Sequence, residues 1–139
     1  MKIEVLKKSD IIQYKALIDN CFGHSNDIDL YNKYEQNTAY TIFVAKDQGE
    51  IIGSVTQYAI DLFTFSFQPC LMLFNVAVKQ EFRRQNVAQV LLREVISNAR
   101  KQGYQSISLT CLDNAHAAHH LYESLGFEKN NSVKYSMDL

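Results

Sequence analysis

The stretch RRQNVA, residues 83–88, stands between an apolar segment and an amphipathic one. The segment before it, LMLFNVAV (71–78), has the length and composition of a buried strand. After it, apolar residues recur at helical spacing from Val87 onward, and polar residues occupy the opposite side, which predicts a helix. RRQNVA therefore joins a strand to the start of a helix, and this strand-loop-helix unit is the feature from which the fold is predicted.

The start of a helix is suited to hold a phosphate. Its first N–H groups have no partner within the helix and carry the positive end of the macrodipole, so a pyrophosphate placed there needs little else. Judged on six residues alone, a solvated turn is the simpler interpretation. Asn86 stands where glycine would be easier, and asparagine is among the residues that best tolerate a positive φ.

Periodicity and helix-ending glycines predict the remaining elements. We predict strands over 2–7, 40–47, 50–60, 105–112 and 132–139, and helices from the Ser9 or Asp10 cap to about Cys21, over about 27–36, and over 114–125. The resulting order, β-α-α-β-β-β-α-β-α-β, predicts a mixed α/β sheet flanked by helices. We expect residues 1–139 to form a single domain.

Composition argues against two kinds of partner. Lys and Arg number 14 against 15 Asp and Glu, and this net charge of -1 lacks the basic excess of a nucleic-acid-binding protein. No apolar stretch approaches the roughly 20 residues of a membrane span, and the charged N-terminus lacks the apolar core of a signal peptide. We therefore expect a cytoplasmic protein without a nucleic-acid or membrane partner. The apolar neighbours of Cys21, Cys70 and Cys111 favour buried thiols.

Two motifs in this order resemble those of one enzyme family. Arg83, Asn86 and Ala88 occupy the three fixed positions of the loop pattern Q/R-x-x-G-x-G/A, between a strand and a helix. Downstream, AHHLYESLGF carries A-x-x-x-Y-x-x-x-G-F with Tyr122 at its centre. Together they resemble the GNAT superfamily of acyl-CoA-dependent N-acetyltransferases, and the resemblance covers residues 71–127.

The resemblance implies the GNAT fold and acetyl-CoA as co-substrate. In this family the backbone N–H groups of the loop bind the pyrophosphate, and the preceding strand splays from its neighbour at a bulge so that its backbone pairs with the pantetheine arm. The residues implied to bind the cofactor are Val76, Ala77, Val78, Arg83, Arg84, Gln85, Asn86, Val87, Ala88 and Asn114.

The resemblance also implies that Tyr122 is the general acid. A phenol with a pKa near 10 holds its proton at pH 7 and can give it, or a hydrogen bond, to the departing thiolate. From spacing alone, a packing role is the simpler interpretation for a tyrosine on the stripe of this helix, and it is the motif that favours a functional role.

A general base is not identified. Many relatives carry glutamate just before the Asn-Val of the strand, and Phe74 stands there in this chain. Deprotonating an alkyl amine at pH 7 costs roughly 4 kcal/mol unless a group assists. The alternatives are Asp113, His116, His119, His120, a water held by Asn75, or no base at all.

His116 and His120 share one helix face at the spacing of helical zinc sites. A polar helix face explains them more simply, since no companion ligand motif is evident, and we expect no metal.

The expected reaction is acetyl transfer to a primary amine of a small molecule or protein. In the family the acceptor lies opposite the cofactor, in a space bounded here by residues 22–31 and 61–67. A non-catalytic CoA-binding sensor or partner-binding module of the same fold is the alternative, because Phe74 and Asn86 depart from the family pattern. A homodimer is compatible with the resemblance, since family members often pair through their C-terminal strands.

Overall fold

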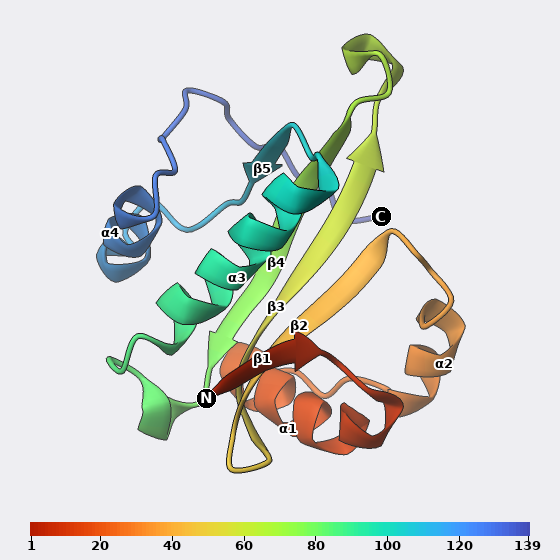
Figure 1. Ribbon diagram of the computed structural model, residues 1–139, viewed down its shortest axis with the longest axis vertical. Helices are drawn as coiled ribbons and strands as arrows, with labels where there is room; N and C mark the ends of the chain where they lie inside the picture. Colours follow the sequence, from red (N-terminus) through yellow and green to blue (C-terminus); the bar gives the residue numbers. More distant parts are fainter.

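The computed structural model describes the backbone of residues 1–139 and all side chains except those of Leu30, Lys33, Tyr34 and Phe65. Its centre is a mixed sheet with the strand order β1-β2-β3-β4-β5 (Figure 1). The first four strands pair antiparallel, and the last pairs parallel with β4. The strands are β1 (Lys2–Val5), β2 (Tyr40–Asp47), β3 (Glu50–Asp61), β4 (Pro69–Val78) and β5 (Ser106–Ser108).

Helices cover both faces of this sheet. The α-helices are α1 (Ile11–Phe22), α2 (Tyr31–Tyr34), α3 (Val87–Gln102) and α4 (His116–Ser124), and short 3-10 turns occur at η1 (Lys8–Asp10), η2 (Ile28–Leu30), η3 (Phe63–Phe65) and η4 (Gln80–Phe82). The mixed α/β class is confirmed, as is the helix that begins at Val87. None of these helices, over the described residues, is long and apolar enough to cross a bilayer.

The core has two halves because neighbouring residues of β2 point to opposite faces of the sheet. Phe43 and Ala45 pack with the buried stripe of α3, which includes Leu91, Leu92 and Val95. Ile42 and Val44 pack instead with Leu17 and Ile18 of α1. The two helices are therefore fixed on opposite sides of the same strands.

Gly53 lets the start of α3 lie directly on the sheet. A Cβ at this position would lie 2.9 Å from Val87 Cγ1 and 3.1 Å from the carbonyl oxygen of Ala77. The missing side chain brings the first turn of α3 against the end of β4, where the RRQNVA loop leaves the sheet.

Two of the predicted strands and one helix need correction. Residues 132–139 form no strand, because a strand requires a partner and the segment has no strand beside it in the described part of the chain. The strand predicted over 105–112 is limited to Ser106–Ser108, since β4 runs beside it only over that length. The helix predicted over 27–36 is replaced by η2 and the four residues of α2.

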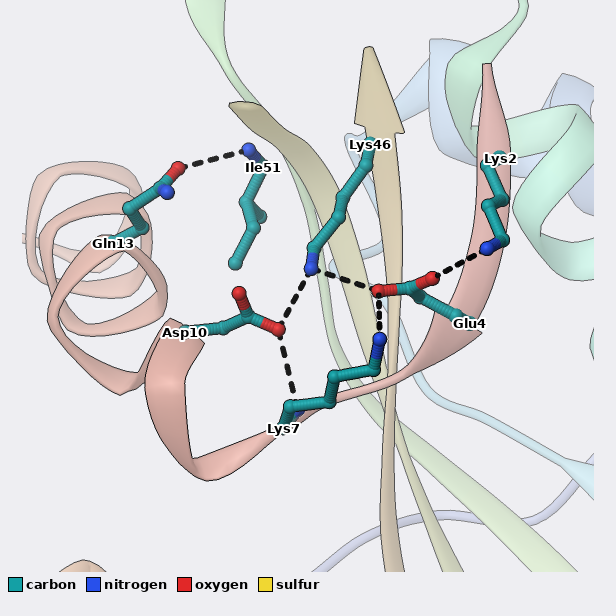
Figure 2. A network of polar contacts seen from close by, with 7 residues as sticks. All are labelled: Lys2, Glu4, Lys7, Asp10, Gln13, Lys46 and Ile51. Carbon is teal, nitrogen blue, oxygen red and sulfur yellow. Dashed lines mark hydrogen bonds and ion pairs between the residues drawn. The ribbon is translucent and has the colours of Figure 1, made fainter. Parts of the chain in front are cut away.

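A network of charges ties β1 and β2 to the start of α1. Figure 2 shows the Lys46 ammonium between two carboxylates, 2.7 Å from Glu4 and 2.8 Å from Asp10. The ammonium of Lys2 lies 3.3 Å from Glu4 as well. These cations, Lys46 first, lower the pKa of the Glu4 carboxyl from its ordinary 4.5 to about 2.

We expect Glu4→Gln to destabilise the fold at neutral pH and to have little effect near pH 2. A carboxyl whose pKa is lowered in the folded state contributes stability above its unfolded pKa of 4.5, and this contribution is lost as pH falls toward 2. Urea midpoints at pH 7 and pH 3 measure the difference between variant and wild type. Glu123→Gln, at an exposed position of α4, is the control. An equal difference at pH 7 and pH 3 would contradict the ion-pair explanation.

Candidate active site

An opening between β4 and β5 begins where their pairing ends. The two strands pair only at Cys70 with Ser106, Leu71 with Ile107 and Met72 with Ser108. Beyond these pairs β4 continues to Val78, while the chain after Ser108 leaves the sheet. The backbone edge of β4 past Met72 is thereby exposed toward the opening (Figure 1).

A bulge lies on this free part of β4. Ala77 is opposite Ser54 and Phe74 is opposite Thr56, so two residues of β4, Asn75 and Val76, stand against a single residue of β3. Asn75 has a φ of 54°, which turns the strand. The expected bulge is present, and Val76, Ala77 and Val78 line the edge that follows it.

The loop after β4 is shaped as a concave set of backbone N–H groups. Arg84 and Asn86 have φ values of 62° and 63°, and Gln85 between them is not in the left-handed region. Alternation of this kind turns successive N–H groups toward one point and makes an anion-binding concavity. The positive φ expected for Asn86 is confirmed; that of Arg84 was not predicted.

The N–H groups of this loop are available to a ligand. The first bond of α3 runs from the Val90 N–H to the Asn86 carbonyl, at 3.0 Å. From Arg84 to Gln89, no N–H makes a well-formed bond to a backbone carbonyl among the described residues. The Asn86 side chain makes no capping bond within that same set. A pyrophosphate would therefore satisfy donors that the fold leaves open.

Two side chains of the loop fold back on the backbone. Arg83 Nε donates to the carbonyl oxygen of Val78 at 3.1 Å, and Gln85 Nε2 donates to that of Glu81 at 3.1 Å. The Arg83 guanidinium is thus held at the end of β4, beside the N–H groups of the loop. Its positive charge favours an anion near this loop.

Tyr122 lies on α4 and faces a hollow of about 920 Å³ beside β5. Its ring packs edge-on against Phe127, with 6.0 Å between centroids. Burial, and to a lesser degree the neighbouring Cys111, raises the pKa of the Tyr122 phenol above 10. The group therefore keeps its proton throughout the neutral range and can act as a donor.

A thiol and an imidazole lie in the same hollow, and sequence reasoning did not pair them. Cys111 Sγ is 3.8 Å from His119 Nδ1 and 3.7 Å from its Nε2, and Nε2 lies 3.0 Å from the Leu112 carbonyl oxygen. Donation from Nε2 to that carbonyl leaves Nδ1 as an acceptor for the thiol. Cys111 and His119 are eight residues apart with a turn between them, and no sequence motif predicts a contact at that spacing.

The other candidate bases are more exposed. Asp113 borders the hollow and lies 3.6 Å from the Lys129 ammonium. His116 and His120 are exposed on α4, outside the hollow.

Two further residues named from the sequence are exposed and are not candidate bases. Phe74 is 44% exposed at the bulge. Asn114 is also exposed, and its carbonyl accepts the His116 N–H at 3.0 Å.

Tyr14 lies on the face of the sheet opposite α3. It extends from α1 and packs with the core half that contains Ala77, next to the bulge. Burial raises the pKa of its phenol to about 12. Ser54, opposite Ala77, has a buried hydroxyl without a hydrogen-bond partner among the described side chains. No sequence motif links Tyr14 to this site.

The side chains that the structure describes contain no group of three or more His, Cys, Asp or Glu placed to hold a metal ion. The three cysteines are free thiols and half-buried.

Comparison with protein families gives one match. The family model described as "Acetyltransferase (GNAT) family" matches residues 11–127. This range contains the bulge of β4, the loop and Tyr122. Human N-acetyltransferase 8B is 33% identical over 101 residues, which are 73% of this chain and 44% of that protein. The chain spans about half the length of the curated relatives it matches.

Solved structures share the fold at low sequence identity. An aminoglycoside acetyltransferase from an uncultured soil metagenomic sample, in complex with sisomicin, has a TM-score of 0.88 at 21% identity, covering 99% of this chain and 95% of that one. A transcriptional regulator from Bacillus halodurans has a TM-score of 0.87 at 18% identity, covering 99% of each chain. Proteins described as enzymes and as a regulator thus have the same fold, so function has to be argued from the site.

Proposed function

The chain belongs to the acetyltransferase (GNAT) family, and from this premise we propose that it transfers an acetyl group from acetyl-CoA to a primary amine of a small molecule or protein. The reaction forms a C–N bond, breaks the thioester C–S bond and moves one proton from the amine to the thiolate, directly or through intermediates. The site must therefore bind the co-substrate, polarise its carbonyl and supply a proton. We assign this activity to the cytoplasm.

The concavity at residues 84–88 is the observation that carries the proposal. Its alternating φ values, the open N–H groups of the first turn of α3 and the nearby Arg83 guanidinium together fit a pyrophosphate. Val76, Ala77 and Val78 lead from it along the free edge of β4, where backbone groups can pair with an amide-containing arm. We assign cofactor binding to these residues and to Asn114.

Tyr122 is the residue we assign to proton donation. Its phenol is protonated at neutral pH, and it lies beyond β5 on the α4 side of the opening. A hydrogen bond from the phenol to the departing sulfur favours thiolate release. The backbone N–H of Val76 or Ala77, at the bulge, is the donor we assign to the carbonyl oxygen that gains charge.

Two regions are candidates for contacts with the amine. On the α1 side of the sheet, Tyr14 and the Ser54 hydroxyl lie beside Ala77, the residue that follows the bulge. Their oxygens can accept hydrogen bonds from an ammonium or amine. On the α4 side, the imidazole of His119 can accept a proton and lies in the hollow with Tyr122. We do not assign a base to Phe74, because its side chain has no group that takes a proton.

We expect the purified chain to release free CoA thiol from acetyl-CoA when a suitable amine is present. A panel of polyamines, amino acids, aminoglycosides and peptides with free N-termini covers the main classes of primary amine. Thiol release is followed with a chromogenic thiol reagent, and mass spectrometry identifies the acetylated product. Tertiary amines of matched size serve as controls, since they cannot form a stable amide.

Calorimetric titration with acetyl-CoA separates the proposed enzyme from the alternative. Binding followed by turnover supports the transferase. Binding without turnover against the whole panel favours a CoA-binding sensor or partner-binding module, for which the replacement of glutamate by Phe74 is the sequence argument. Absence of binding would contradict both assignments.

A further inference from the structure

The three cysteines of the chain differ in what their thiols contact. Cys21 Sγ and Cys70 Sγ each lie 3.7 Å from a backbone carbonyl oxygen. A carbonyl oxygen can accept a hydrogen bond from a thiol but does not take its proton away. Among the described side chains, the thiol of Cys111 alone has a basic nitrogen within hydrogen-bonding distance, and that nitrogen belongs to His119.

The Leu112 carbonyl determines which nitrogen of His119 can take a proton. His119 Nε2 lies 3.0 Å from this oxygen. The oxygen carries no proton, so Nε2 must donate, and Nδ1 is left with a free lone pair. Both ring nitrogens lie within 3.8 Å of Cys111 Sγ, and Nδ1 is the one that can accept. A nucleophile, a base and a third group that orients the base are thus placed as the activation of a thiol requires.

This pair lies beside the residue that we assign to proton donation. Cys111 follows β5, at the point where the chain has left β4 and bounds the opening. Its thiol, the His119 ring and Tyr122 line the same hollow of about 920 Å³. The thiol is also close enough to the Tyr122 phenol to contribute to the raised pKa of that group. A thioester whose sulfur is placed at Tyr122 is therefore near Cys111 Sγ.

We propose that Cys111 accepts the acetyl group from acetyl-CoA before the amine does, with His119 as its base. This assignment rests on the acetyl-CoA binding proposed above. The Cys111 thiol gives its proton to His119 Nδ1, and its sulfur forms a C–S bond to the acetyl carbonyl carbon. The C–S bond to CoA breaks, and the proton held by His119 passes to the departing CoA sulfur, directly or by way of the Tyr122 phenol.

This exchange needs no oxidant, reductant or further reactant. One alkyl thioester replaces another, so the two sides of the reaction are close in free energy and the step can run in both directions. The acetyl group on Cys111 keeps the reactivity of a thioester toward amines. A covalent intermediate of this kind divides one difficult step into two easier ones.

The acetylated thiol also gives the amine a base, in place of the carboxylate that is missing at Phe74. Once its proton has passed to CoA, His119 Nδ1 is free to accept again, and it lies beside the sulfur that carries the acetyl group. The amine then forms the C–N bond, the C–S bond to Cys111 breaks, and the amine proton passes through His119 to the Cys111 sulfur. One imidazole thereby serves both halves of the reaction.

The test does not require the amine to be known. The full chain is incubated with acetyl-CoA and isotopically labelled CoA, and we expect the label to appear in acetyl-CoA because the acetyl group passes to Cys111 and back. Mass spectrometry of the intact chain should show one added acetyl group, which neutral hydroxylamine removes from a thioester but not from an amide. Trypsin releases residues 102–129, in which Cys111 is the single cysteine, so the acetyl group can be located.

Three variants assign the roles. Cys111→Ala should lose the label exchange and the acetyl-enzyme, and its amine turnover should fall about 100-fold or more, while His119→Asn should slow the exchange about 100-fold because the base is lost. Cys70→Ala is the matched control, since Cys70 is also a half-buried free thiol and is not among the residues that line the hollow; it should exchange label at the wild-type rate. Circular dichroism and calorimetric titration with acetyl-CoA check that each variant folds and binds.

Several results would overturn the proposal. A wild-type chain that binds acetyl-CoA but shows neither label exchange nor an acetyl-enzyme would exclude Cys111 as acceptor, and turnover of an amine by that chain would leave the transferase assignment intact. Equal exchange in Cys111→Ala and wild type would place the acetyl group on another residue. Exchange unchanged in His119→Asn would mean that His119 is not the base.

Two further results separate this proposal from the transferase. Wild-type amine turnover by Cys111→Ala would mean that the thioester is not on the path to the amide, which would overturn the proposal. An acetyl group on Cys111 that no amine of the panel removes would support Cys111 as acceptor and count against the amine transferase.

Discussion

Tyr122→Phe is expected to lower the turnover of acetyl-CoA by about 100-fold and to leave its dissociation constant nearly unchanged, since a general acid typically contributes at least this factor. The substitution removes the phenol oxygen and keeps the ring. The edge-on contact with Phe127, at 6.0 Å between centroids, is therefore preserved, and the packing of α4 should not change. Steady-state rates with the best amine of the panel and calorimetric titration with acetyl-CoA measure the two quantities.

The pKa of Tyr122 makes this prediction specific to a proton donor. Burial raises the pKa of its phenol above the ordinary 10, so loss of activity through its deprotonation should not begin below that pH. Tyr104→Phe is the matched control: Tyr104 is also a half-buried tyrosine, and it is not among the residues that line the hollow. Equal turnover in Tyr122→Phe and wild type would mean that Tyr122 only packs.

Long periodic segments allowed most of the fold to be predicted. The apolar stripe from Val87 to Ala99 spans enough residues for its helical period to be unambiguous. The apolar runs of β2 and β3, joined by Gln48 and Gly49, indicated a hairpin of two buried strands. Short elements were predicted less well. The length of β5 depends on where the chain after Ser108 leaves β4, and the apolar pattern of residues 105–112 does not encode that divergence.

The segment 132–139 shows a different limit. Its alternation is strong, yet it forms no strand, because pairing is a property of two segments and the sequence pattern describes only one. The pattern predicted the local conformation that the segment can adopt. It could not predict whether any edge of the sheet lies beside the segment.

The site was predicted in its backbone features more than in its side-chain contacts. Motif spacing located the loop, and residue chemistry explained the left-handed conformation of Asn86. The same conformation at Arg84 has no residue preference behind it. The contacts of Cys111 with His119 and of Tyr14 with the core beside Ala77 depend on tertiary packing.

Asn86→Val is expected to weaken acetyl-CoA binding about tenfold or more, whereas Asn86→Gly should bind as tightly as wild type or more tightly. A left-handed residue costs roughly 1–2 kcal/mol for ordinary side chains and more for a β-branched one, while glycine adopts it freely. Valine should therefore push position 86 out of its φ of 63° and turn the N–H groups of the loop away from one another. Calorimetric titration of both variants gives the dissociation constants.

Gln48→Val separates loss of the concavity from general strain. Gln48 has a φ of 49° in the turn between β2 and β3, so valine there carries a similar backbone cost outside the proposed cofactor site. Both valine variants should be destabilised in urea, but only Asn86→Val should lose affinity. Unchanged affinity in Asn86→Val would mean that the loop N–H groups do not hold the pyrophosphate. A large loss in Asn86→Gly would mean instead that the asparagine amide is itself a ligand, so the two substitutions together distinguish a backbone site from a side-chain one.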